Sequence, residues 1–364
     1  MGGAGPRVWL ACDWFVKYSA GLARGLVGNG CEVALLTRDH DQEFGGERGA
    51  RREFLAAETG EAVRRLELHG RVRELRGLRE TARLAGERRR FDPAVVHLQD
   101  SVTNDLRLAI ASGLPRQRYA LTVHDPVPHP GDEVHPLPLK LARRALRRRA
   151  SLLFVHSRAL AEELAATGDA GAPIEVVPHG AGVAAFRPPP SDSLLFFGRM
   201  SHYKGLDVLL DALPAIWVAR PQTRLTVAGE GELPEHPSLA DPRVEVRSEH
   251  VPESAVGPLF EAATCVVLPY RQASQSGVGT LAMRHGRPLI ATRLGGLPEL
   301  VGEDRGRVVP GEDPAALSAA VLEVLSAPGL AERLGREAAA FVEREIGWKS
   351  VAAKTVEAYR RHLL

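Results

Sequence analysis

Residues 186–200 read FRPPPSDSLLFFGRM, a proline-rich loop followed at once by an apolar, strand-like run that ends at Gly198 and Arg199. Short apolar runs separated by longer amphipathic stretches precede this loop, and the same alternation starts again after it. Apolar runs without a polar face are typical of parallel strands that helices cover on both sides. Two such series predict an α/β protein with two doubly wound, Rossmann-like domains facing across a cleft.

The proline-rich loop sets the predicted domain boundaries at 1–188 and 189–345, and a final helix at 346–364 is free to pack back on the first domain. In open parallel sheets, ligands bind beyond the carboxyl ends of the strands. We therefore expect the functional residues at these ends. The first series of runs is RVWLACD, EVALLTR, AVVHLQD, YALTVHD, LLFVHS and IEVVPHG, and the second is LLFFGRM, RLTVAGE, VEVRSEH, CVVLPY, PLIATR and GRVVPG.

Composition narrows the class of protein. The chain has 364 residues, 44% of them hydrophobic and 25% charged, which suits a globular protein of about two domains. The formal net charge of +2 gives no overall attraction to nucleic acid, so we expect no nucleic-acid partner. The cysteines, Cys12, Cys31 and Cys265, lie in apolar runs and indicate buried thiols rather than a disulfide or zinc framework.

The distribution of apolar residues also bears on location. No apolar stretch approaches the roughly 20 residues that span a bilayer. The first residues, MGGAGPRVWLA, lack the charged-then-apolar order of a signal peptide. We therefore expect a cytoplasmic protein.

Two cations stand out after the run at 194–197. Arg199 and Lys204 are five residues apart and lie where a helix is expected to begin. Cations at the start of a helix oppose its dipole, so an anionic partner is expected. The alternative is that both are ordinary surface cations.

The chain from FFGRMSHYKG to the last helix resembles the donor half of the retaining GT-B glycosyltransferases of family four. The resemblance rests on Gly198-Arg199, on Lys204-Gly205, and on GRPLIAT and GGLPELV further along; it extends more loosely to LTVHD, VHS and VPHGAGVAAF in the first half. It implies that the first domain binds an acceptor and the second a nucleotide sugar. It also implies that Arg199 and Lys204 contact the donor's diphosphate.

The expected chemistry agrees with this implication. The departing phosphate gains negative charge as the sugar leaves, and fixed cations stabilise that charge most in the transition state. The backbone N–H groups of the turn SQSGVG, before a helix, suit the same phosphates. We therefore expect no cofactor and no metal, only a nucleotide-sugar substrate. UDP is the expected nucleotide, with GDP and dTDP as alternatives.

The donor side departs from the family pattern at one point. Members carry two glutamates, and the matching positions here are Ala273 and Leu281. The segment SQSGV is similar to branches that lack this pair, so the sugar and ribose contacts must come from other groups. The donor-binding residues that we expect are Gly198, Glu230, Val251, Ser274, Gln275, Ser276, Gly277 and Val278.

The first domain supplies the expected acceptor side. The segment DWFVKYSAG replaces the family's Gly-Gly loop, and Gln99 stands where the family has a histidine. We expect His124, at a strand end, to face the reacting sugar as a catalytic residue. Plain loop packing remains the alternative for Asp13, Lys17 and Tyr18. The acceptor-side residues that we expect are Asp13, Lys17, Tyr18, Gln99 and His129.

Two segments suggest metal binding. HDPVPHPGDEVH, at 124–135, carries three histidines and two aspartates, but their spacing matches no helical or finger pattern. A semi-rigid wall of the cleft is the favoured interpretation. Asp39 and Asp41 form an Asp-x-Asp that metal-dependent glycosyltransferases of another fold use. Here it follows the second strand, and a solvated loop is favoured.

Residues 140–149 contain a run of arginines interleaved with leucines. A solvated basic face is the favoured interpretation, and the alternative is weak association with an anionic membrane surface or contact with a phosphorylated acceptor. For the whole chain we expect a retaining, metal-independent glycosyltransferase. Its acceptor would be a small molecule or a lipid-linked molecule, either a natural product, as in antibiotic biosynthesis, or a surface-glycan precursor. A non-catalytic nucleotide-sugar-binding protein or partner subunit of the same fold is the alternative.

Overall fold

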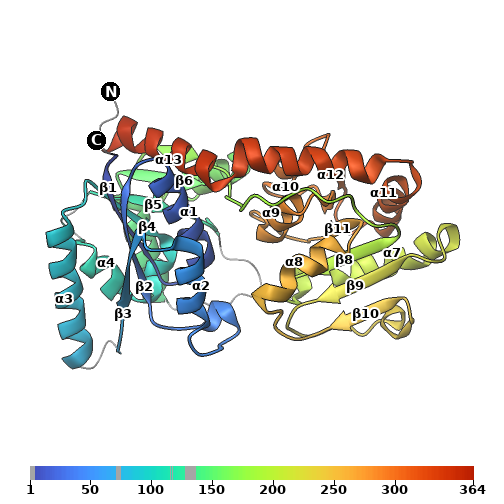
Figure 1. The fold of residues 1–364 in the computed structure, drawn as a ribbon, viewed down its shortest axis with the longest axis horizontal. Helices are drawn as coiled ribbons and strands as arrows, with labels where there is room; N and C mark the ends of the chain where they lie inside the picture. Colours follow the sequence, from blue (N-terminus) through green and yellow to red (C-terminus); the bar gives the residue numbers. More distant parts are fainter. Residues whose placement is uncertain (1–4, 71–74, 115, 117, 128–136) are drawn as a thin grey trace. The chain divides into compact units, whose positions relative to one another are not determined.

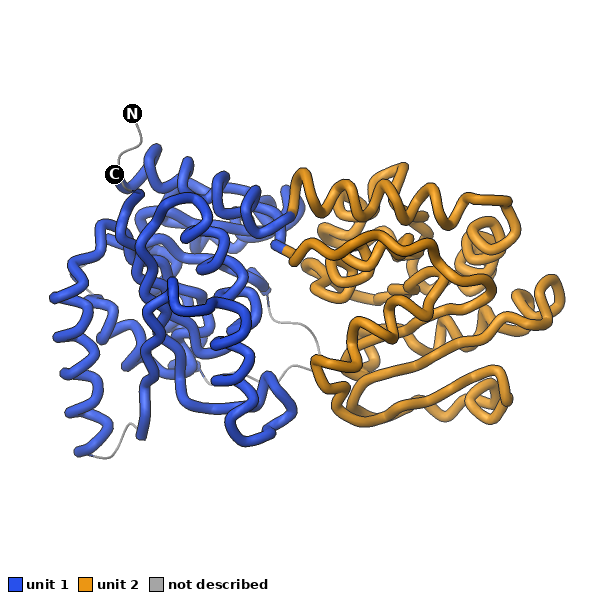
Figure 2. Tube along the Cα trace, viewed as in Figure 1, with its two compact units in different colours: residues 1–127, 133–180, 347–364 blue, residues 128–132, 181–346 orange. Residues whose placement is uncertain are grey.

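The computed structural model describes residues 5–70, 75–114, 116, 118–127 and 137–364. The chain forms two compact units (Figure 2). Unit 1 holds the chain up to Val127, the stretch that ends at Gly180, and Gly347–Leu364; unit 2 holds Ala181–Ile346. Within the described residues, the chain passes from unit 1 to unit 2 after Gly180 and returns after Ile346, so its last helix belongs to unit 1.

Unit 1 is built on a seven-stranded parallel sheet with the order β3-β2-β1-β4-β5-β6-β7. Its strands are β1 (Arg7–Cys12), β2 (Glu32–Arg38), β3 (Val63–Leu68), β4 (Val95–Gln99), β5 (Ala120–Thr122), β6 (Leu152–Val155) and β7 (Ile174–Val176). Its helices are α1 (Val16–Gly28), α2 (Ala50–Thr59), α3 (Leu75–Phe91), α4 (Leu106–Ala111), α5 (Leu137–Arg149), α6 (Arg158–Ala166) and α13 (Trp348–His362).

Unit 2 is built on a six-stranded parallel sheet with the order β10-β9-β8-β11-β12-β13. Its strands are β8 (Ser193–Phe197), β9 (Arg224–Ala228), β10 (Val244–Arg247), β11 (Cys265–Leu268), β12 (Leu289–Thr292) and β13 (Gly306–Val309). Its helices are α7 (Leu206–Ala219), α8 (Glu253–Glu261), α9 (Gly277–Arg284), α10 (Leu297–Val301), α11 (Pro314–Ser326) and α12 (Leu330–Phe341). The predicted α/β class is confirmed (Figure 1).

Strand β1 shows why the central strands are largely apolar. Its side chains alternate between the two faces of the sheet. Val8, Leu10 and Cys12 enter the core cluster that includes residues of α1 and α13, whereas Trp9 and Ala11 enter the cluster formed with α3, α4 and α6. Both faces exclude water from Val8 to Cys12, so no position in that part of the strand can be polar without a partner. The three cysteines are free and buried, as predicted.

Strand β3 is missing from the predicted runs. Its sequence, VRRLEL, carries Arg64, Arg65 and Glu67 among its apolar residues. It lies at the edge of the sheet and pairs only with β2, so several of its side chains reach solvent. Charged residues are typical of such edge strands.

Glycines explain how α13 packs on α1. A Cβ atom at Gly21 would lie 2.1 Å from the Trp348 ring, and one at Gly25 would lie 2.2 Å from the Trp348 carbonyl oxygen. A Cβ atom at Gly180 would lie 2.2 Å from the same ring. All three glycines are therefore needed for the close approach of Trp348.

Alanine at Gly25 is expected to lower the free energy of unfolding by about 1–3 kcal/mol, because its Cβ would meet a backbone oxygen that cannot turn away. Urea denaturation measures the effect. Gly28→Ala is the matched control in the same helix: a Cβ there meets nothing within 4 Å, so we expect an unchanged or slightly higher stability. Equal stability of the two variants would contradict this account of the α1–α13 contact.

Among the described residues, one bent pair of helices meets the length and composition of a membrane span. Within the described residues, no single helix has both the length and the apolar character needed to cross a bilayer. Pro314–Ser326 and Leu330–Ile346 meet these criteria only when taken together, and they are bent by 96° at their junction.

Candidate functional site

Each sheet has one place where the strand order reverses, between β1 and β4 in unit 1 and between β8 and β11 in unit 2. In open α/β sheets ligands bind at the carboxyl ends of the strands beside such a point. In unit 2 the segments after β8 and β11 carry Arg199, Lys204 and the turn at 274–279. The candidate donor site therefore lies within unit 2.

Lys204 ends the 3₁₀ turn η3 (His202–Lys204) and is partly buried. Its Nζ donates a hydrogen bond of 2.8 Å to the Tyr270 hydroxyl and lies 4.3 Å from the centroid of that ring. Among the described residues, no carboxylate pairs with it. Burial alone would lower the pKa of Lys204, but its contacts with Tyr270 raise it, so the side chain is a cation at neutral pH.

Arg199 follows β8 and is exposed. It lines a cavity of about 740 Å³ together with Ser201, Tyr203, Glu232 and Arg271. In the described part of the chain its guanidinium has neither a hydrogen bond nor an ion pair. Arg271, on the same cavity, differs: it binds Asp207 with both of its terminal nitrogens at 2.7 and 2.8 Å. Arg199 is thus available to an anion.

Gly198 lies beside both the lysine and the turn before α9. Its φ of 110° is in the region that favours glycine. A Cβ atom there would lie 3.4 Å from Val278 and 3.6 Å from the Lys204 ammonium. A side chain at this position would therefore be strained and would narrow the space next to Lys204.

The turn at 274–279 begins α9. Ser276 is its N-cap, and its Oγ accepts a hydrogen bond of 3.1 Å from the Gly279 N–H. Among the described residues, the N–H groups of Gly277 and Val278 donate to no partner. Free N–H groups at a helix start suit an anion such as phosphate. They lie near Gly198, which Val278 contacts.

The other expected donor residues lie at neighbouring strand ends or within the turn. Glu230, after β9, is exposed, and its carbonyl accepts from the Met200 N–H at 2.7 Å. Val251 precedes α8 and packs against the core of unit 2. Ser274 is buried, and Gln275 has a buried Oε1 without a partner in the described structure.

In unit 1, the structure places His124 after β5, fully buried. Its ring stacks on Phe15 with a centroid distance of 3.7 Å, and Tyr18 meets it edge-on at 5.0 Å. Phe15 has a φ of 65°, which is uncommon for a residue with a side chain. Because Phe15 covers the ring, contact between His124 and a sugar stays a prediction that requires Phe15 to move.

His124 belongs to a chain of buried polar groups. His156 Nδ1 lies 3.0 Å from the Val177 carbonyl, His156 Nε2 lies 3.1 Å from His124 Nδ1, and His124 Nε2 lies 2.8 Å from Gln99 Oε1. Each of these three hydrogen bonds needs one proton, and the oxygens at the two ends, on Val177 and Gln99, can only accept. Two neutral imidazoles supply two of the three protons. Burial holds the pKa of both histidines well below the ordinary value. The Gln99 amide nitrogen, which has no other partner in the described residues, supplies the third proton when it faces His124.

The remaining acceptor-side candidates are held by their own chain. Asp13 is buried, and hydrogen bonds with His40 and Asn104 outweigh the effect of burial and lower the pKa of its carboxyl. Tyr18 is buried among three histidines and Trp348. The Lys17 ammonium lies 5.1 Å from the Phe44 ring. His129 lies outside the described residues.

The loop after β2 contains two caps that the sequence did not reveal. The Glu43 carboxylate accepts hydrogen bonds of 2.8 and 3.1 Å from the N–H groups of Val16 and Lys17 at the start of α1. Asp41 accepts from two N–H groups at the start of α2. The expectation of a merely solvated Asp-x-Asp loop is therefore wrong for Asp41, whose carboxylate caps a helix.

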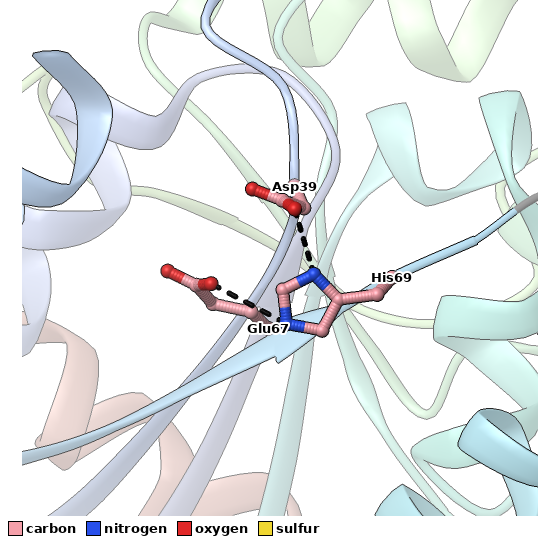
Figure 3. A group of neighbouring side chains, drawn as sticks. All are labelled: Asp39, Glu67 and His69. Atoms are coloured by element: carbon pink, nitrogen blue, oxygen red, sulfur yellow. Dashed lines mark hydrogen bonds and ion pairs between the residues drawn. The ribbon is translucent and has the colours of Figure 1, made fainter. Parts of the chain in front are cut away.

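Asp39, Glu67 and His69 bring their ligand atoms within 4.8 Å of one another (Figure 3). Two guanidinium groups already neutralise the carboxylates. Arg51 lies 2.9 Å from Asp39 and 3.1 Å from Glu67, and Arg52 lies 2.7 Å from Glu67. A divalent cation would add two positive charges beside these arginines, so the cluster is better suited to joining α2 to β2 and β3.

Helix α5 carries the basic run of 140–149. Arg147 is buried and donates to the carbonyls of Asp125 and Pro126, and Arg144 and Arg148 lie 2.7 and 3.5 Å from Asp169. The expected solvated basic face therefore has one arginine that faces the interior. Leu137 and Leu141 are exposed on the same helix.

Family models match both halves of the chain. The model of "Glycosyl transferases group 1" matches residues 191–327, and that of "Glycosyltransferase Family 4" matches 16–183. The D-inositol 3-phosphate glycosyltransferase of Streptomyces scabiei is 34% identical over 189 residues, which cover 47% of this chain and 42% of that protein. A glycogen synthase of Mycobacterium tuberculosis is 32% identical over 176 residues, covering 46% and 42%. The chain thus spans less than half the length of these curated relatives.

Solved structures resemble the chain over almost its whole length. A sucrose-phosphate synthase from Thermosynechococcus elongatus superposes with a TM-score of 0.73 and 19% identity, covering 98% of both chains. HepE of Anabaena, solved in complex with UDP and glucose, superposes with a TM-score of 0.74 and 16% identity, covering 98% of this chain and 99% of that one. At these identities the likeness shows a shared fold.

Proposed function

The chain belongs to the group 1 and family 4 glycosyltransferases and has their GT-B fold, and we propose that it transfers a sugar from a nucleotide sugar to an acceptor hydroxyl with retention of configuration. In this reaction the bond between the sugar carbon and the phosphate oxygen breaks, and a bond to the acceptor oxygen forms on the same face. The acceptor proton passes to the departing phosphate.

One observation carries the proposal. Lys204 is a partly buried cation without a carboxylate partner in the described structure, at the point of the sheet where ligands bind. Arg199 and the free N–H groups at 277–278 belong to the same strand-end region. Such groups stabilise the charge that develops on a departing diphosphate.

We propose a UDP-sugar as donor, because HepE, which shares the fold, was solved with UDP and with UDP-glucose. Gly198, Gln275, Ser276 and Val278 would line the phosphate and sugar positions. The acceptor side would lie in unit 1, at the end of β4 and β5, with His124 close to the sugar. A natural product or a surface-glycan precursor suits this acceptor role.

A non-catalytic nucleotide-sugar-binding protein is the second candidate, favoured by the missing carboxylates at Ala273 and Leu281. Both positions are partly buried and pack against the core of unit 2. Their apolar side chains offer no polar group to a bound sugar. Release of UDP from UDP-glucose by the purified chain distinguishes the two. Release that Lys204→Ala abolishes supports the transferase, whereas UDP binding without release supports the binding protein.

We also propose that the reaction needs no metal, because cations and backbone N–H groups take the place of a metal at the phosphates. The rate of UDP release is therefore expected to be unchanged by EDTA. The measurement compares initial rates before and after chelation, with readdition of manganese as the control. Loss of the rate with EDTA and its return with manganese would contradict the proposal.

Weak membrane association through α5 is a separate proposal. Leu137 and Leu141 are exposed beside Lys140, which suits an anionic lipid surface. Co-sedimentation with vesicles that contain anionic lipid should exceed that with neutral vesicles. Equal sedimentation with both would remove membrane association from the account.

A further inference from the structure

We propose that Tyr270 is a positioning residue, which holds the Lys204 ammonium in place for the donor's diphosphate. The inference rests on the proposed function of the β8–β11 site. The sequence does not indicate this role, because Tyr270 ends the apolar run CVVLPY, which is predicted only as a strand.

The backbone of the Lys204 turn is fixed on the segment that contains Tyr270. Arg271 N–H donates to the Tyr203 carbonyl at 2.7 Å, and the Arg271 side chain donates to the His202 carbonyl at 3.1 Å. Gly205, with a φ of 67°, lies so close to Pro269 that a Cβ atom would be 2.0 Å from its carbonyl oxygen. The turn and this segment therefore form one rigid piece.

The Tyr270 side chain fixes the direction of the lysine. Tyr270 is 2% exposed and packs in the core of unit 2, and its carbonyl accepts from the Thr292 hydroxyl at 2.7 Å. Its hydroxyl and its ring both contact Lys204 Nζ. A buried ring with little freedom thus removes most of the freedom of a long side chain.

The choice of a phenol over a carboxylate matters for the charge. A carboxylate at this place would also orient the ammonium, but it would cancel the positive charge that a diphosphate needs. A neutral hydroxyl orients the ammonium and leaves its charge available. Other cations of unit 2, such as Arg271 and Arg220, are instead paired with carboxylates.

The same hydroxyl connects the lysine to α9. Tyr270 Oη lies 3.3 Å from Ser276 Oγ, which caps α9 through the Gly279 N–H. The chain from Lys204 through Tyr270 to Ser276 therefore sets the ammonium and the helix start at a fixed separation. Both groups are expected to bind the same diphosphate.

A double-mutant cycle tests the proposal. Wild type, Tyr270→Phe, Lys204→Ala and the double variant of the full chain are titrated by calorimetry with UDP, GDP and inorganic pyrophosphate. Tyr270→Phe is expected to weaken binding by about tenfold, since one hydrogen bond to a charged group is lost. In the Lys204→Ala background the same change should have no further effect, because Tyr270 acts through Lys204.

Tyr119→Phe is the matched control. Its buried hydroxyl donates to the Leu146 carbonyl at 2.6 Å in unit 1, so its loss should lower stability without changing nucleotide binding. If Tyr270→Phe fails to fold, as judged by its thermal melt, Tyr270→Met takes its place in the cycle.

The outcomes separate the two levels of the argument. Weaker binding in Lys204→Ala with unchanged binding in Tyr270→Phe would overturn the role of Tyr270 but not the diphosphate site. An equal loss of affinity on changing Tyr270 in the wild-type and Lys204→Ala chains would do the same. Failure of the wild-type chain to bind UDP, GDP and pyrophosphate would overturn the proposed diphosphate site, and the inference with it.

Discussion

Replacement of Lys204 by alanine is expected to slow sugar transfer by about a hundred- to a thousandfold while leaving the fold intact. Loss of one fixed donor to a developing oxyanion costs about 2.7–4 kcal/mol in the transition state. The ammonium has no carboxylate partner in the described structure, so its removal leaves no buried charge unpaired. Initial rates of UDP release from UDP-glucose, with a thermal melt of each variant, measure both parts of this prediction. Arg199→Ala is expected to act in the same direction.

Lys349→Ala provides the matched control for the lysine. Lys349 is exposed on α13, in unit 1, and its carbonyl rather than its side chain bonds to Asn29. We expect wild-type rates in this variant. Wild-type rates in Lys204→Ala as well would show that the β8 turn is not the diphosphate site. A fall in rate accompanied by a clear fall in melting temperature would point to a structural role for Lys204 instead.

The sequence predicts the fold well because most strands are buried on both faces. Strand β11 has no polar position, and β1 has only Arg7 at its exposed start, so their apolar runs are visible without any structure. Strand β3 is the exception, since an edge strand can place Arg64 and Arg65 in solvent. The alternation of runs also predicts parallel sheets, because a parallel connection requires a crossover.

The site is predictable only where it is local in sequence. Arg199 and Lys204 lie in one turn after one strand, so their spacing can be recognised. The contact between Lys204 and Tyr270 joins residues that are 66 apart, and nothing in either residue's neighbours indicates it. Glu43 illustrates the same point, since it caps α1 from a different loop.

In unit 1, a place at the end of a strand does not show that a side chain is open to a ligand. A residue at a strand end is expected to face a ligand, and His124 and Gln99 are at strand ends. In the structure, Phe15 covers His124, and the histidines bond to one another and to the chain. Whether a residue at a strand end is accessible to a ligand depends on the loops that cover it. The hydrophobic periodicity of the sequence does not describe these loops.

Those histidines make the stability of the chain sensitive to acid. Burial lowers the pKa of His97 and His156 to about 3, that of His179 to about 4, and that of His124 well below the ordinary value of 6.5. The folded chain keeps them neutral, whereas the unfolded chain takes up protons below about pH 6.5. Their contribution to stability is therefore complete above that pH and is lost as the pH falls toward 4.

The expected loss is large. Each histidine lowers the free energy of unfolding by about 1.4 kcal/mol at one pH unit below its unfolded pKa, so the four together account for about 6 kcal/mol near pH 5.5. Asp100 acts in the opposite direction, because burial raises the pKa of its carboxyl to about 6 and the folded chain holds that proton more tightly. Burial also raises the pKa of Glu43, and these two carboxyls offset only part of the effect of the four imidazoles. The net loss is comparable with the whole stability of a typical domain.

Urea denaturation at about pH 7.5 and pH 5.5 measures this loss, and the change of unfolding free energy with pH gives the number of protons taken up. His97→Gln is expected to lower that number by about one, because His97 is fully enclosed between Tyr359 and Thr122. His202→Gln, at an exposed position on the η3 turn, is the control variant. Equal urea midpoints at the two pH values would mean that the histidines are already charged in the folded chain, and the neutral chain from Val177 to Gln99 would then be wrong.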